Sequence, residues 1–134
     1  MRFFLWVSFW FVAIVLHAQD YSHLQTTLTS LSSTNSTTRE NTWQELIKSN
    51  QIPLTLADSV LFLYRGEAKT VAWMGDFNGW GYDKEFQNQG KQIAGTDIWY
   101  LKTSFPKDAR LDYKILINGT EWMVDPNNPH QQWS

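Results

Sequence analysis

A series of short strand-like segments constrains the fold of this chain more than any other feature. Five apolar segments each end at a turn signal: residues 59–66, 69–76, 97–105, 110–119 and 120–126. Turns recur about every eight to twelve residues, and 16% of the chain is aromatic, as is typical of antiparallel sandwiches. No helical pattern separates these segments, which excludes a parallel α/β arrangement. The sequence therefore predicts an all-β sandwich.

Alternation of side chains assigns the faces of these segments. In segment 110–119, Leu111, Tyr113, Ile115 and Ile117 share one side, while Asp112, Lys114 and Leu116 share the other. In segment 69–76, Val71 and Trp73 point one way, and Ala72 and Met74 the other. Apolar rows of this kind belong between two sheets, so Lys114 is expected to face solvent.

The N-terminal part divides into two regions. Residues 1–18 have one basic residue, Arg2, then an apolar run and a small residue before Gln19, which predicts a secretory signal peptide, with an uncleaved N-terminal anchor as the alternative. Residues 19–52 are expected to form a polar arm, Ser/Thr-rich and linker-like over residues 20–38, with a short helix near Trp43. In that helix, Thr42 and Glu45 match a capping box. The sandwich is expected to occupy residues 53–134.

Charge and cysteine content exclude several classes of function. Removing residues 1–18 leaves 10 basic residues against 13 acidic ones, a net charge of −3, which argues against a nucleic-acid or anionic-membrane partner. The chain has no cysteine, so disulfides, thiolate-bound zinc and thiol catalysis are excluded. We expect an exported protein, periplasmic or extracellular, with no cofactor and no metal.

Catalysis within this chain is not expected. The sequence has no Gly-x-Ser-x-Gly elbow, and His23 and His130 have no nucleophile placed with them. The acids Asp76, Asp83 and Glu85 near one turn are expected to be solvated loop residues. The same turn resembles a calcium loop, but it lacks an oxygen ligand at the fifth position and a glutamate at the twelfth.

Tryptophans are the remaining candidates for a site. Trp73 and Trp99 lie within apolar strand patterns and are expected in the core. Trp80 and Trp122 each follow a glycine-bearing turn, at Asn78-Gly79 and Asn118-Gly119. On the pattern alone, these two rings either cap the ends of the sandwich or, with Lys114 and Asn78, form a platform for a sugar ring.

The residues also resemble a known family. "VAWMGDFNGW" and "LDYKILINGTEWMVDPNNP" are similar to family-48 carbohydrate-binding modules, which are early-set immunoglobulin-like sandwiches. The matching elements are Gly75, Phe77, Asn78 and Trp80; Tyr113, Lys114 and Ile115; Asn118, Gly119 and Trp122; Asp125 and Pro126. The likeness covers about residues 57–130. It implies that Trp80, Lys114 and Trp122 hold a sugar.

The stretches "FLYRGEAKTVAWMGDFNGWG" and "DPNNPHQQWS" more specifically resemble the N-terminal module of secreted enterochelin-esterase- and feruloyl-esterase-like proteins. That resemblance implies an α/β-hydrolase domain, with a Ser-His-Asp triad, after Ser134. It also implies that the last strand of the sandwich, and a further sugar-binding Asn in it, are missing, so we expect a fragment or a split reading frame.

Three functions remain open at this stage. The first is a module that binds a polysaccharide or oligosaccharide weakly. The second is an accessory domain of an esterase that acts on plant polysaccharide esters or related esters; it packs on or roofs the hydrolase active site and binds no glycan itself. The third is a structural or interaction sandwich that binds no glycan and pairs through an exposed edge strand.

Overall fold

The computed structural model describes residues 22–82 and 88–130 and consists mostly of β-sheet with a few helices. The predicted signal peptide at residues 1–18 lies outside the described residues. Two helical segments come first, at residues 22–31 and α2 (Ser36–Lys48). Two antiparallel sheets follow and pack as a β-sandwich, which confirms the predicted sandwich architecture.

The first sheet has four strands and the second has three. In the four-stranded sheet the order is β1 (Leu54–Leu56), β2 (Ser59–Arg65), β5 (Ile98–Ser104) and β4 (Lys91–Gln92). In the three-stranded sheet the order is β3 (Val71–Gly75), β6 (Tyr113–Ile117) and β7 (Glu121–Met123). A short 3₁₀ segment, η1 (Asp76–Gly81), follows β3 directly. The five predicted strands are confirmed, whereas β1 and β4 were not predicted.

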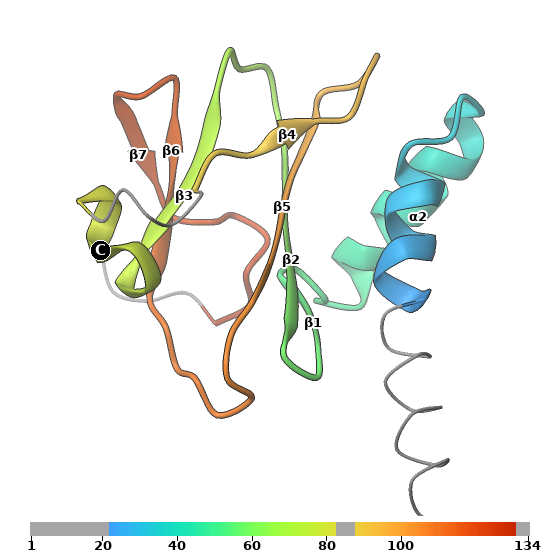
Figure 1. Ribbon diagram of the computed structural model, residues 1–134. Coiled ribbons are helices and arrows are strands. Elements are labelled where there is room, and N and C mark those ends of the chain that lie inside the picture. The colour runs from blue at the N-terminus through green and yellow to red at the C-terminus, as the bar shows by residue number, and fades with distance from the viewer. Residues whose placement is uncertain (1–21, 83–87, 131–134) are drawn as a thin grey trace, which may run out of the picture.

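The four-stranded sheet lies between the helices and the other sheet (Figure 1). Its inner face contributes Phe62, Trp99 and Leu101 to a core shared with the three-stranded sheet. Its outer face packs Leu61, Leu63 and Ile98 against the helices. Successive residues of β2 are therefore buried on opposite faces, as the continuous apolar run of that strand requires.

The first helix corrects the predicted linker. Residues 20–38 were expected to be weakly structured, but residues 22–31 are helical and bury Leu24, Leu28 and Leu31. These leucines are spaced i, i+4 and i+7, so they share one face of the helix. That face joins the core on the outer side of the four-stranded sheet. The arm is thus a packed layer, and its Ser and Thr residues lie mostly on the opposite, exposed side.

Helix α2 begins six residues before the predicted capping box. Asn35 is the N-cap, and its Oδ1 accepts the backbone N–H groups of Thr37 and Thr38. Thr42 instead lies within the helix and donates to the Thr38 carbonyl, so the predicted Thr42–Glu45 box is wrong. The helix buries Trp43 and Leu46, as its spacing predicted.

Arg65 connects α2 to the four-stranded sheet. Its guanidinium donates to Glu40 at 2.7 Å and to Asp97 at 3.0 Å, and it lies 5.7 Å from the centre of the Trp43 ring. The hydrogen bonds from Gln44 and Arg65 lower the pKa of Glu40 below its usual value. One cation therefore joins α2, β2 and the residue that precedes β5.

Candidate functional site

The register of the three-stranded sheet places Lys114 and Trp122 on its solvent side. Trp73 pairs with Ile115, and both are fully buried between the sheets. Their neighbours along each strand must therefore point away from the core, which places Met74 and its partner Lys114 on the outer face. Trp122 pairs with Leu116 on that same face and is 49% exposed. The outward orientation predicted for Lys114 is confirmed.

Lys114 and Trp122 are diagonal neighbours on adjacent strands. Lys114 lies two residues before Leu116, the partner of Trp122, and such diagonal positions are about 7–8 Å apart. A lysine side chain spans that distance with ease. Lys114 forms no ion pair with any residue in the ranges 22–82 and 88–130. We therefore treat Lys114 as a candidate ligand contact beside the indole.

Trp80 lies in η1, next to the residue that covers this face. Gly81 lies directly over the outward side chain of Met74, because a Cβ added at Gly81 would meet its sulfur at 3.1 Å. The Nδ2 of Asn88 also donates to that sulfur, so Met74 is covered although it points outward. Trp80, one residue before Gly81, is 38% exposed. We call Trp80, Lys114 and Trp122 the platform.

The backbone around Trp80 has an unusual conformation. Gly79, Trp80 and Gly81 have φ values of 54°, 58° and 94°. Glycine adopts positive φ readily, but a large side chain in this region is an outlier that commonly accompanies function. The glycines on either side let the chain turn sharply, so that the indole is displayed beyond the end of β3.

Asn78 does not belong to the platform. It was predicted to contact a glycan, but it is 0% exposed. Its Oδ1 accepts the Gly75 N–H at 3.0 Å, and its Nδ2 donates to the Trp73 carbonyl at 2.9 Å. A ligand on the outer face cannot reach these atoms. Asn78 instead fixes the turn that carries Trp80.

Trp122 is positioned by the β6–β7 hairpin. Asn118 and Gly119 have φ values of 53° and 73°, the pair of positive values that a type I′ turn needs. The Oδ1 of Asn118 accepts the backbone N–H groups of Lys69 and Thr70 at 2.7 and 3.3 Å. This side chain anchors the hairpin to the turn before β3, and so holds β7 in register.

A buried polar network, which the sequence did not reveal, lies on the other side of the sheet. The Tyr113 hydroxyl donates to Asp125 at 2.8 Å and accepts from Asn128 at 3.2 Å, while the Asn127 N–H donates to Asp125 at 2.9 Å. Burial raises the pKa of Asp125, which these hydrogen bonds partly offset. Burial, and next the Asp125 charge, raises the pKa of Tyr113. Tyr113 therefore stays neutral and serves as the donor.

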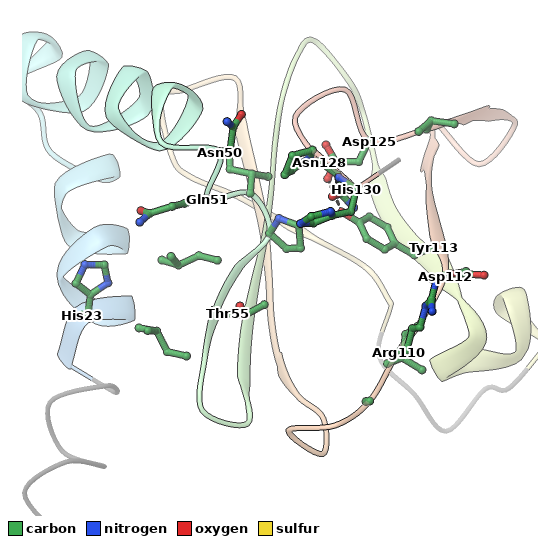
Figure 2. Close-up of a pocket in the computed structure, with 18 residues that line it drawn as sticks. His23, Asn50, Gln51, Thr55, Arg110, Asp112, Tyr113, Asp125, Asn128 and His130 are labelled. Atoms are coloured by element: carbon green, nitrogen blue, oxygen red, sulfur yellow. Dashed lines mark hydrogen bonds between the residues drawn. The ribbon is translucent and has the colours of Figure 1, made fainter. Parts of the chain in front are cut away.

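This network borders a cavity of about 900 Å³ between the sandwich and the N-terminal helix. Figure 2 shows Tyr113, Asp125, Asn128 and His130 grouped on one side, with His23 on the helix across from them. None of Trp80, Lys114, Trp122 or Asn78 lines it. Because the Asp125 oxygens are already hydrogen-bonded, we assign the network a structural role.

The described residues provide few other sites. Within residues 22–82 and 88–130, no group of three or more His, Asp or Glu side chains could hold a metal ion. Of the predicted loop acids, Asp76 is hydrogen-bonded to Trp80 and Asp112, whereas Asp83 and Glu85 lie outside the described residues. No helix in the described part is long and apolar enough to cross a membrane.

Comparison with known proteins does not assign a function to this chain. No protein-family model matches the chain, and no curated protein matches it.

Proposed function

We propose that this chain is a non-catalytic carbohydrate-binding module whose platform stacks against sugar rings. The proposal is supported by two exposed indoles: Trp122 lies on the solvent side of the three-stranded sheet, diagonal to Lys114, and Trp80 lies in the segment after β3 whose Gly81 covers Met74 on that side. Tryptophan is enriched at binding interfaces, because its ring offers a large apolar face together with one polar N–H.

The chemistry of the platform suits a hydroxylated ring. A sugar offers an apolar C–H face to an indole and hydroxyl groups to the Lys114 ammonium. Covering half an indole removes roughly 100 Å² of apolar surface from water, which contributes on the order of 2–3 kcal/mol. Two such contacts, after the cost of association, correspond to a Kd in roughly the micromolar to millimolar range. The ligand is therefore a polysaccharide or oligosaccharide that is bound weakly.

The finer identity of the module rests on sequence resemblance. The motifs around Trp80, Lys114 and Trp122 support an immunoglobulin-like early-set fold of the family-48 carbohydrate-binding type. The resemblance to esterase N-terminal modules supports export and a role as the accessory domain of a secreted ester hydrolase. In that role the module would hold the enzyme close to its polysaccharide substrate.

Titration with maltohexaose and xylohexaose tests glycan binding directly. We expect heat and chemical-shift changes with one of them, and we expect that Trp80→Ala and Trp122→Ala each abolish most of the heat. Lys114→Ala should weaken binding, whereas Lys91→Ala, which removes an exposed lysine from the other sheet, should not. Binding that persists unchanged in both tryptophan variants contradicts the platform.

The absence of binding to either sugar favours the alternative, a structural sandwich that recognises no glycan. The accessory role has a separate test, which is to read the coding sequence that follows codon 134. A Gly-x-Ser-x-Gly domain there supports the esterase role, and we expect that domain to raise the melting temperature of the module. An unrelated sequence in all three frames contradicts it.

A further inference from the structure

Asp76 occupies the junction between the three-stranded sheet and the exposed Trp80. Its backbone N–H donates to the Asp112 carbonyl at 3.0 Å. Its Oδ2 accepts the Asp112 N–H at 3.0 Å, and its Oδ1 accepts the Trp80 indole N–H at 3.2 Å. One side chain therefore joins the end of the sheet to a residue of the platform.

The hydrogen bond from the Asp112 N–H to the Asp76 carboxylate extends the β3–β6 ladder. Regular pairing ends at Gly75 and Tyr113. In the next antiparallel pair the Asp112 N–H would ordinarily bond to a backbone carbonyl. Here the Asp76 carboxylate takes that place, so the backbone can leave the sheet and enter η1 while the Asp112 N–H keeps an acceptor.

The hydrogen bond from the Trp80 indole N–H to Asp76 orients the Trp80 ring. Trp80 has φ 58° and ψ 32°, a conformation that is unfavourable for a large side chain and persists only where neighbouring contacts maintain it. The hydrogen bond from its indole N–H to Asp76 is such a contact. It also turns the polar edge of the ring toward the protein, so that the exposed surface of the indole is carbon.

The two indoles therefore differ in how they are held. Trp122 forms no hydrogen bond through its indole N–H with any described residue, and its strand position is set by pairing with Leu116. Trp80 is fixed before a ligand arrives, which reduces the entropy lost on binding. Hydroxyl groups of a ligand must then be met by Lys114 and by the N–H of Trp122.

We propose that Asp76 is a positioning residue of the glycan platform: its carboxylate fixes the plane of the Trp80 ring, so that Trp80 contributes stacking and no hydrogen bond to the ligand. This inference rests on the proposed function. Asp76 is itself exposed and meets the ring at its N–H edge, and the inference does not require it to touch the sugar.

Variants of Asp76 in the 134-residue chain test this inference. Asp76→Ala removes both acceptors, and Asp76→Asn keeps one oxygen, which can serve either Asp112 or Trp80 but not both. Asp108→Ala is the matched control, because it removes one exposed carboxylate from a different loop. The indole ¹⁵N–¹H resonances of Trp73 and Trp99 report whether each variant keeps its core.

Two readouts give the expected result. The indole ¹⁵N–¹H resonance of Trp80, identified by its loss in Trp80→Phe, should shift and exchange faster with water in both Asp76 variants and not in Asp108→Ala. The Kd for the bound hexaose should rise about three- to tenfold in Asp76→Ala, as expected when one side chain loses its fixed orientation. In a Trp80→Ala background, Asp76→Ala should have no further effect on Kd.

Three outcomes would overturn the inference. An unchanged Trp80 resonance in Asp76→Ala shows that the carboxylate does not hold the ring. A full effect of Asp76→Ala in the Trp80→Ala background shows that Asp76 contacts the ligand directly. An unchanged Kd with a shifted resonance shows that the orientation does not matter for binding. If the wild type binds neither hexaose, the proposed function fails, while the resonance still decides whether Asp76 holds Trp80.

Discussion

The two faces of the β3–β6–β7 sheet use the same residue type for opposite purposes. On the inner face, Trp73 is fully buried and packs 5.9 Å from Phe62, ring centre to ring centre. On the outer side, Trp80 and Trp122 keep much of their surface in water. Both arrangements follow from the pleat of the strands and from where the turns fall. The contrast teaches that the side of the sheet, and not the residue type, decides whether an indole stabilises the fold or is displayed.

The N–H groups of these indoles show the opposite of what burial alone would suggest. The buried N–H groups of Trp73 and Trp99 have no hydrogen-bond acceptor among the described residues, whereas the exposed Trp80 N–H is bonded to Asp76. Burial of a large ring outweighs one unsatisfied donor in the core, since the apolar area removed from water is large. On the outside, the hydrogen bond has a different effect, which is to orient the ring.

The largest expected effect concerns the inner face. Trp73→Ala should lower the free energy of unfolding by about 3–5 kcal/mol, because it removes a buried ring and leaves a cavity between the sheets. Urea denaturation followed by circular dichroism measures this change. A loss below about 1 kcal/mol would show that the two faces do not differ as described.

An intermediate effect is expected at Asp125, which is 1% exposed. Asp125→Asn replaces one of the two oxygens that accept from Tyr113 and Asn127 by an NH₂ group, which cannot accept, and should cost about 1–3 kcal/mol of unfolding free energy. Urea denaturation at a series of pH values measures it. The charge-matched comparison is Asp108→Asn at an exposed loop position, which should leave the stability close to that of the wild type.

The pH dependence at Asp125 has a defined sign. Because burial raises the pKa of Asp125 in the folded state, the folded protein binds this proton more readily than the unfolded chain does. Its contribution is fully present below the unfolded value, about 3.9, and is lost as the pH rises through the folded pKa. The stability difference between the wild type and Asp125→Asn should therefore shrink as the pH rises across that window. A difference that grows with pH would contradict the assignment.

The smallest effect on stability is expected on the outer face. Trp122→Ala removes a half-exposed ring from an edge strand, where a cross-strand contact with Leu116 is worth less than about 1 kcal/mol. Its denaturation midpoint should stay close to that of the wild type, although its glycan binding should be lost. A loss of stability as large as that of Trp73→Ala would show that Trp122 belongs to the core.

Much of the sandwich could be predicted from local sequence. The strands β2, β3, β5, β6 and β7 carry apolar or alternating patterns that end at turn residues, and these patterns also placed Lys114 outward and Trp73 inward. The N-terminal helix could also have been found, because its leucines repeat at helical spacing. Its Ser- and Thr-rich composition obscured that signal, since composition averages over the exposed and buried faces of a helix.

Other features had no local signal. Asn78 has the composition of an exposed turn residue, yet it is buried, because its amide completes hydrogen bonds with Gly75 and Trp73. The short strands β1 and β4 are strands only because they pair with β2 and β5. Tyr113 and Asp125 are 12 residues apart in the sequence, and their hydrogen bond forms only because the chain folds back after β7.

The sequence by itself therefore determined the strands, their two faces and the turns that precede Trp80 and Trp122, because alternation and turn conformation depend on neighbouring residues. Only the tertiary structure decided that Lys114 and Trp122 lie on one outer face, that Asn78 lies inside and that Asp76 is hydrogen-bonded to both Asp112 and Trp80. Those outcomes depend on pairing between segments such as residues 76 and 112, which are far apart in the chain and are brought together only by the packing of the sheets.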